Sequence, residues 1–116
     1  MPTIPVTRTE VSAGYAIMAT WAGLANGDDG AAFEAPEYGD RVVQFQGTFG
    51  SGTIVLQGSN DGTNWHTLND AGNAAISKTA NSLETVMEVP RFVRPLLSGG
   101  TAGSVTVTLF CRRTQR

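Results

Sequence analysis

The stretch SVTVTLFC, residues 104–111, gives the clearest indication of the fold. Val105, Val107, Leu109 and Cys111 lie on one face of an extended chain, and two threonines and a phenylalanine lie on the other. Alternation of this kind is typical of a β-strand that packs one face against a core. We therefore predict a strand over residues 104–111 with Cys111 in the core, where a thiol behaves as a small hydrophobe.

Weaker alternation predicts further strands along the preceding sequence, separated by turn-forming residues. These strands are expected at residues 15–22, 41–48, 53–59, 64–68, 83–89 and 91–97, with a short one near Ile76 inside a loop over 70–82 and a loop over 31–40. In the first of them Tyr15, Ile17 and Trp21 share one face, which places Trp21 in the core.

Two connections predict hairpins. The glycine-rich residues 49–52 would join strand 41–48 to strand 53–59, and Asn60-Asp61-Gly62 would join strand 53–59 to strand 64–68. Gly62 is expected in the left-handed conformation that a bulged hairpin loop requires. Pro90 and Pro95 lack the N–H group that a sheet ladder uses, so strand 91–97 is expected outside the centre of a sheet.

The whole pattern predicts an all-β chain: an antiparallel β-sandwich or jelly-roll-like fold with seven or eight short strands. The 116 residues and 12.2 kDa correspond to one domain, which we place at residues 13–116. Residues 1–12 form an extended arm, because Pro2 and Pro5 exclude a helix. This arm either frays or becomes ordered on a neighbouring subunit.

Charge is segregated along the chain, although the net charge is only −2. That sum argues against a general nucleic-acid binder. Residues 24–40 contain five acids and no base, and residues 89–116 contain five arginines, including Arg116, and no acid. The two segments are either solvated patches or complementary contact surfaces between copies of the chain or with a larger partner. The candidate contacts are Arg91, Arg94, Arg112 and Arg113 on the basic side and Asp28, Asp29, Glu34 and Glu37 on the acidic side; for Arg94 a salt bridge within the fold is the alternative.

Candidate catalytic groups are scarce. His66 is the one histidine and is expected on a strand edge, and Cys111 is expected in the core, so neither pattern indicates a nucleophile with its base. Asp28-Asp29 and Asn60-Asp61 could bind calcium, but turn chemistry of Asp and Asn explains both without a metal. We expect no cofactor, no metal and no enzymatic activity.

Three stretches together resemble a known class of protein: WAGLANGD at 21–28, GSNDGTNW at 58–65, and RFVRP at 91–95 running to GGT at 99–101. Over residues 15–113 the chain is similar to the capsid decoration, or cement, proteins of tailed phages. The resemblance implies a small β-sandwich that clamps neighbouring capsomers and has no catalytic residues. It also implies the major capsid protein and the chain itself, as a dimer or trimer, as partners, with neither nucleic acid nor membrane. The protein would be made in the bacterial host cytoplasm and would lie on the outer capsid surface of the virion.

A second function remains open from the residues themselves. Turns like GSNDGTNW also occur in phage tail and adhesin β-domains, and many β-sandwich modules bind sugars on exposed aromatic rings. This alternative is a carbohydrate-binding or adhesin module of a phage tail or cell-surface protein, and it predicts two or more coplanar exposed aromatic side chains around Trp65.

Overall fold

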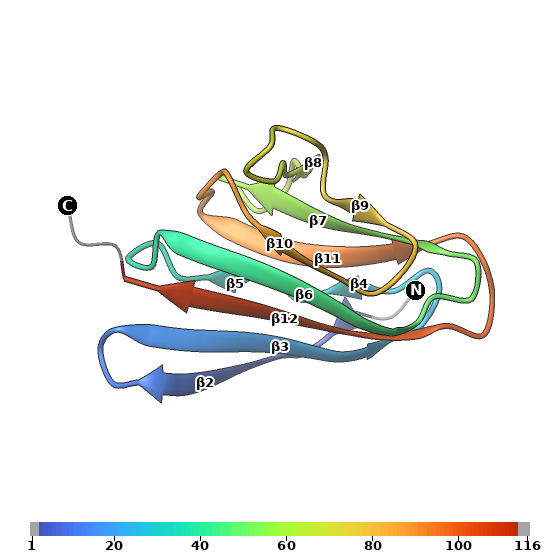
Figure 1. The fold of residues 1–116 in the computed structure, drawn as a ribbon, viewed down its shortest axis with the longest axis horizontal. Coiled ribbons are helices and arrows are strands. Elements are labelled where there is room, and N and C mark those ends of the chain that lie inside the picture. The colour runs from blue at the N-terminus through green and yellow to red at the C-terminus, as the bar shows by residue number, and fades with distance from the viewer. Residues whose placement is uncertain (1–2, 114–116) are drawn as a thin grey trace.

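Two β-sheets packed face to face make up the structure, a computed structural model that describes residues 3–113 (Figure 1). This confirms the predicted all-β sandwich, and all but one of its strand pairs are antiparallel. The described residues form seven strands of four or more residues and five strands of two residues. Pro2 and Arg116 lie outside the described residues. No helix in the described part of the chain is long and apolar enough to cross a membrane.

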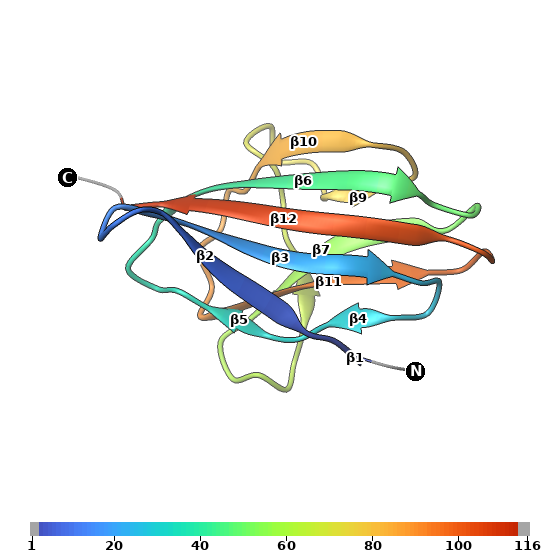
Figure 2. The same ribbon diagram turned by 90° about the horizontal axis from the view of Figure 1, so that it is seen from below.

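One sheet has five strands in the spatial order β10-β6-β12-β3-β2, and Figure 2 shows them side by side. In chain order these strands are β2 (Val6–Ser12), β3 (Ala16–Leu24), β6 (Asp40–Thr48), β10 (Ser82–Thr85) and β12 (Ser104–Arg112). The strand predicted from residues 104–111 is β12, and it lies at the centre of this sheet between β6 and β3.

The other sheet has seven strands, and its main path runs β1-β4-β11-β7-β8. Its members are β1 (Thr3–Ile4), β4 (Asp29–Gly30), β5 (Phe33–Glu34), β7 (Thr53–Ser59), β8 (His66–Thr67), β9 (Ser77–Lys78) and β11 (Phe92–Ser98). Strand β5 pairs with β11, and β9 pairs with β7. The segment 31–40, expected as a loop, contributes the two-residue strand β5. The short strand expected near Ile76 within the loop 70–82 is β9, which buried Ile76 directly precedes.

The core between the sheets follows the alternation of the sequence. The four residues predicted inward on β12 are fully buried, Cys111 included. Trp21 is fully buried as well, and its Nε1 donates a hydrogen bond to the Ala31 carbonyl at 2.9 Å. Gly30 allows this packing, because a Cβ there would lie 2.6 Å from the Trp21 ring. Tyr15 corrects one prediction: β3 begins at Ala16, and the Tyr15 side chain is 58% exposed in the preceding turn.

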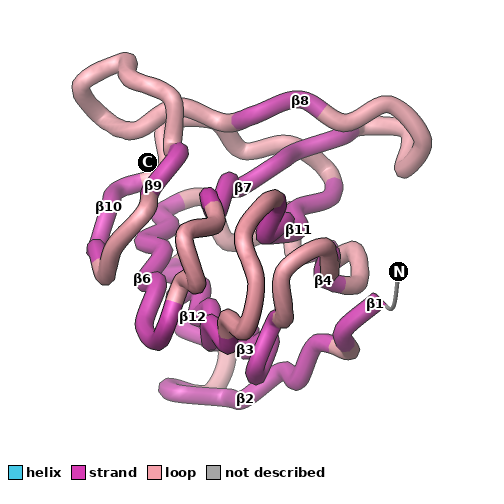
Figure 3. Tube along the Cα trace, turned by 90° about the vertical axis from the view of Figure 1, so that its right-hand side faces the viewer, coloured by secondary structure: helices cyan, strands magenta, loops and turns pink. Residues whose placement is uncertain are grey.

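The predicted hairpin across residues 49–52 is wrong, because β6 and β7 belong to opposite sheets. The connection crosses from one sheet to the other and buries Phe49. Next to it the β11–β12 connection makes the reverse crossing, and Thr101 N donates to Gly50 O at 2.8 Å between the two loops. Figure 3 looks onto the end of the sandwich where both crossings lie. Alternation reports which face of a strand is buried, and a hairpin and a crossing have the same alternation.

The second predicted hairpin is confirmed, because β8 pairs antiparallel with β7 across the Asn60–Gly62 turn. Gly62 has a φ of 77°, the left-handed conformation expected for it. The returning strand is shorter than predicted, at two residues.

Pro95 overturns the prediction that β11 avoids the centre of a sheet, since β11 pairs with β7 on one side and with β4 and β5 on the other. Leu97 N donates to Asp28 O at 3.0 Å, so its N–H points toward the β4 side. N–H directions alternate along a strand, and the Pro95 nitrogen therefore faces the same side. There β4 pairs with Leu96 and β5 with the first two residues of β11, so the missing N–H falls at the break between two short strands.

The N-terminal segment, expected to fray or to become ordered on a neighbouring subunit, pairs with strands of its own chain in the structure. Val6–Ser12 is extended, as expected from the prolines, but it pairs along β3 of its own chain. Before it, Thr3–Ile4 pairs parallel with β4 of the other sheet. The segment thus bridges both sheets at one side of the sandwich, and Val6 and Ile4 pack against the core. The arm has enough backbone partners within its own chain to be ordered there.

Candidate functional site

The acidic and basic segments of the sequence meet within the fold. Strands β4 and β5 come from the acidic segment and flank β11, which carries Arg94 and is directly preceded by Arg91. Arg91 Nε lies 2.8 Å from Glu34 Oε2, and Arg94 Nη1 lies 3.2 Å from Asp29 Oδ2. Four of the eight predicted contact residues are therefore paired with one another inside the chain.

Arg94 has the most side-chain partners of these four residues. It projects from the outer face of the seven-stranded sheet, because its neighbours Val93 and Pro95 are buried on the inner face. Its guanidinium lies 4.2 Å from the centre of the Trp65 ring, and its Nε donates to Gln57 Oε1 at 3.0 Å. The side chains of Arg94 and Asp29 are only 23% and 21% exposed. We call Arg94, Trp65, Gln57 and Asp29 the Arg94 cluster.

The chemistry of the Arg94 cluster is that of a recognition surface. Trp and Arg are the residue types most enriched among those that dominate binding energy at protein interfaces. The guanidinium is held by a ring, an amide and a carboxylate at once, so little side-chain freedom remains to be lost when a partner binds. The outward side chains of Phe92 and Leu96 flank Arg94 on β11 and are half-buried, which adds apolar surface to the same face.

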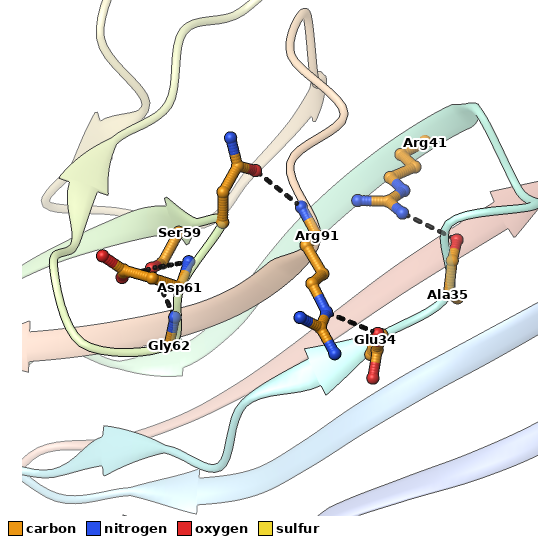
Figure 4. A network of polar contacts seen from close by, with 8 residues as sticks. Glu34, Ala35, Arg41, Ser59, Asp61, Gly62 and Arg91 are labelled. Atoms are coloured by element: carbon orange, nitrogen blue, oxygen red, sulfur yellow. Dashed lines mark hydrogen bonds and ion pairs between the residues drawn. The ribbon is translucent and has the colours of Figure 1, made fainter.

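Arg91 borders this face and connects it to the Asn60–Asn64 loop (Figure 4). Its backbone N–H donates to Asn60 Oδ1 at 3.1 Å. At the end of β7, Ser59 Oγ donates to Asp61 Oδ1 at 2.9 Å and accepts from Gly62 N at 2.9 Å, which joins the strand to the loop.

The Asp61 carboxylate is the centre of that loop. It accepts hydrogen bonds from Thr63 N and Asn64 N, both at 2.8 Å, and from Asn64 Nδ2. These donors hold the pKa of Asp61 well below its ordinary value. Among residues 3–113 no group of three or more His, Cys, Asp or Glu side chains could hold a metal ion, and turn chemistry accounts for the Asn60-Asp61 pattern.

A second arginine cluster surrounds Tyr38 at the end of the sandwich where β12 finishes. The guanidinium groups of Arg8 and Arg113 lie 5.8 Å and 5.7 Å from the centre of the Tyr38 ring. Arg41 donates from Nε to the Tyr38 carbonyl at 2.9 Å. Its Nη2 donates to the Ala35 carbonyl at 2.8 Å, which Figure 4 shows. We call Arg8, Arg41, Arg113 and Tyr38 the Tyr38 cluster.

Arg41 was missed among the candidate residues. It is 2% exposed, and within residues 3–113 its Nη1 has no hydrogen-bond partner. Removal from water lowers its pKa below the ordinary arginine value, since burial disfavours the charged form. The signal was present in the sequence: the alternation that places Val43 and Phe45 inward also places Arg41 inward.

The remaining predicted contacts differ in availability. Arg112 Nη2 lies 3.3 Å from Asp40 Oδ2, both side chains being well exposed, and Glu37 and Arg113 are exposed too. Asp28 is only 5% exposed, and its Oδ2 accepts from Ala25 N at 2.9 Å. Asp28 therefore closes a turn and is removed from the candidate contacts, because its carboxylate is occupied inside the fold.

A polar pocket of about 510 Å³ opens beside the Asn60–Asn64 loop. Its lining includes the polar residues Asn60, Asn64, His66 and Glu88 and also Gly58, Leu68 and Pro90. No hydrogen bond or ion pair joins His66 to an acid in the described part of the chain. Both Glu88 oxygens already accept hydrogen bonds from Asn69.

Neither tryptophan forms an open aromatic platform. Trp21 is in the core, and one face of Trp65 is covered by the Arg94 guanidinium. Tyr15, which is exposed, lies at the end of the other sheet. The coplanar exposed aromatic side chains expected around Trp65 for a sugar-binding module are therefore not found among residues 3–113.

Comparison with known proteins shows the fold. No protein-family model matches the chain, and no curated protein sequence matches it significantly. Among solved structures, the SPBc2 prophage-derived protein YomS is similar over 88% of this chain and 98% of its own, with a TM-score of 0.64 and 13% identity. A cupin domain from Bordetella pertussis has a TM-score of 0.49 at 12% identity, covering 97% of this chain and 98% of its own. Peruvianin-I, a cysteine peptidase from Thevetia peruviana latex, has a TM-score of 0.45 at 14% identity, covering 94% and 63%. The last two are too dissimilar to support any argument.

Proposed function

We propose that this protein is a non-enzymatic structural protein of a tailed phage, which binds the outer surface of the assembled capsid as a symmetric oligomer. The observation that carries the proposal is the sandwich shared almost from end to end with a prophage-derived protein. The two arginine clusters support it, because they offer recognition chemistry on a small scaffold. The major capsid protein is the proposed partner, and the virion is the proposed location after synthesis in the host cytoplasm.

The proposed mechanism is linkage. A protein that binds the assembled shell and not its free subunits stabilises the shell by RT ln(1 + [L]/Kd) for each site. At a free concentration of one hundred times Kd this amounts to about 2.7 kcal/mol per site. Repeated over many sites, that free energy helps the shell to resist the pressure of packaged DNA.

The exposed arginines are the proposed capsid contacts. Arg112 and Arg113 lie at the end of β12, and within the described residues Arg113 has no ion pair with an acid. Arg91 and Arg94 would contribute from the outer face of the seven-stranded sheet. Reversing these exposed charges should act mainly on the association of the protein with the capsid. Charges at the rim of an interface steer the encounter of the two partners and fix their relative position.

The test mixes the protein with empty, expanded capsids and measures occupancy by cosedimentation and by added density in electron microscopy. The variant R112E/R113E should reduce occupancy while leaving the melting temperature of the free protein nearly unchanged. Lys78→Glu is the control for charge reversal on β9 of the other sheet. Because Lys78 is half-buried and lies 3.1 Å from Glu84 Oε2, its melting temperature is measured beside that of R112E/R113E. Absence of the wild-type protein from capsids would contradict the function, and unchanged occupancy of R112E/R113E would contradict the assigned contact.

A carbohydrate-binding or adhesin module is the second candidate, and the polar pocket next to Trp65 favours it. Amide, imidazole and carboxylate groups beside apolar side chains match the mixed polar and apolar surface of a sugar. A glycan array followed by a melting screen distinguishes the two functions. A glycan-dependent rise in melting temperature, lost in Asn64→Ala, would replace the capsid proposal with this one.

A further inference from the structure

Strand β2 is the longest free sheet edge in the described part of the chain. It spans seven residues, Val6–Ser12, and it pairs with β3 on one side alone. The opposite edge of the same sheet, β10, has four residues, and the edge strands β1 and β8 of the other sheet have two each. An edge of this length presents a row of unpaired backbone N–H and C=O groups, which is a template for another strand.

The charges of β2 select what can pair with it. Arg8 and Glu10 lie on the same side of the strand, with Arg8 Nη2 3.6 Å from Glu10 Oε1 and both side chains about half exposed. Charged residues on an edge discourage pairing with most other strands, because a mismatched charge would be enclosed. An edge that carries both signs accepts a partner whose charges run in the opposite order.

A second copy of β2 has that opposite order. Two identical strands that pair antiparallel about a two-fold axis perpendicular to the sheet must place one residue opposite itself, since paired residues share a face. With the axis at Thr9, Arg8 lies opposite Glu10 of the second copy, and Glu10 lies opposite its Arg8. The axis at Arg8 or at Glu10 would instead place like charges opposite each other, and the axis at Thr7 would draw Pro5 into the ladder.

The regular part of β2 centres on the same residues. Its pairing with β3 is regular from Val6 to Glu10, and the register shifts between Glu10 and Ser12, so Val11 lies at an irregularity where the regular ladder ends. Val11 is 55% exposed, one of the few large apolar side chains open to solvent on the described surface. Pairing would cover part of it.

We propose that the protein dimerises by antiparallel pairing of β2 with β2 of a second copy about a two-fold axis at Thr9. The five-stranded sheets of the two copies then form one continuous ten-stranded sheet. The partner is a second copy of this chain, recognised by backbone hydrogen bonds and two reciprocal Arg8–Glu10 pairs. This inference deepens the oligomeric part of the proposed function and rests on it only there.

A charge-swap experiment tests the partner and the register. Sedimentation equilibrium of the full chain from micromolar to millimolar concentration should show a monomer–dimer equilibrium. R8E and E10R, each alone, should weaken it roughly tenfold or more, because each makes β2 carry a single sign of charge. An equal mixture of the two variants should restore dimers, since Glu at 8 then faces Arg at 10 across the axis. Loss of folding in one variant could not be repaired by mixing, so restoration separates pairing from stability.

Cross-linking tests the axis directly. Thr9→Cys should form a disulfide between two copies under mild oxidation, because residues opposite each other in an antiparallel pair have Cα atoms about 4.5–5.5 Å apart. Thr7→Cys is the matched control and should not cross-link, since two copies of residue 7 lie roughly 13 Å apart in this register. The native Cys111 is buried and does not interfere.

The outcomes separate this inference from capsid binding, since no capsid is present. A wild-type chain that stays monomeric to millimolar concentration would overturn the dimer, and so would equal cross-linking of the two cysteine variants. A mixture of R8E and E10R no more associated than either alone would overturn the register. A chain that dimerises as described but never binds capsids would leave this inference standing while the proposed function fails.

Discussion

Replacing Arg94 by alanine should destabilise the protein far more than replacing Arg112, although their ion pairs are nearly equal in length. Arg94 lies 3.2 Å from Asp29, and Arg112 lies 3.3 Å from Asp40. The side chains of the first pair are 23% and 21% exposed, and those of the second are 65% and 41% exposed. Solvent access, rather than distance, therefore distinguishes the two pairs.

The magnitude follows from what each arginine contacts. Loss of the Arg94–Trp65 contact costs about 0.5–2 kcal/mol. Loss of the half-buried ion pair and of the hydrogen bond to Gln57 adds about 1 kcal/mol. We expect R94A to lower the free energy of unfolding by about 2 kcal/mol, and R112A to lower it by less than about 0.5 kcal/mol, as at other exposed sites.

Urea unfolding followed by tryptophan fluorescence measures both variants. In a chain of this size a loss of 2 kcal/mol lowers the melting temperature by roughly 6–12 °C. Arg94→Lys should fall between wild type and R94A, because it keeps the charge but loses the planar group that stacks on Trp65. If R94A proved no less stable than R112A, the Arg94 cluster would not be held as the structure shows it, and its role as an ordered recognition surface would be refuted.

Three further predictions concern stability and reactivity. Gly30→Ala should lower the free energy of unfolding by about 1–3 kcal/mol, because the added Cβ would lie 2.5 Å from Cδ of Pro95. Calorimetry of both proteins measures this change. The folded protein holds the Asp61 pKa below its ordinary value, so the unfolded chain binds more protons at acid pH. The stabilisation from Asp61 is then present at neutral pH and lost as the pH falls below about 3.9. Asp61→Asn should reduce the loss of unfolding free energy as the pH falls into the acid range. An unchanged pH dependence of stability would refute the claim that the loop's hydrogen bonds to Asp61 stabilise the fold. Burial raises the pKa of Cys111 to about 11, so a thiol reagent at pH near 8 should label it only as fast as the chain unfolds. Labelling at the rate of a free thiol would contradict that burial.

Alternation allowed the core to be predicted residue by residue. Val105, Val107, Leu109 and Cys111 are all buried as expected, and so is Trp21. These predictions succeed because the direction of a side chain depends on its own position along a strand. The Asn60–Gly62 hairpin was predictable for the same reason, since the turn residues and the left-handed glycine determine the backbone conformation of the turn by themselves.

The candidate site was predictable in composition but not in arrangement. The sequence contains acids in one segment and arginines in another, and both solvated and intermolecular roles are compatible with that. Arg91 pairs with Glu34, and Arg94 pairs with Asp29, because β4 and β5 lie beside β11. The partners are 57 positions apart in the sequence in the first pair and 65 in the second. The Tyr38 cluster likewise depends on Arg8 and Arg113, from opposite ends of the chain, meeting at one ring.

The amino-acid sequence by itself determined that this protein is all-β, where most of its longer strands lie, and which of their faces are buried. Only the tertiary structure decided that β6 and β7 belong to opposite sheets, that Pro95 fits at a break between two short strands, and that residues 6–12 are an edge strand. The physical reason is range. Side-chain direction and turn conformation are set by a few consecutive residues, whereas the choice of a sheet partner depends on hydrogen bonds and packing between segments far apart in the chain.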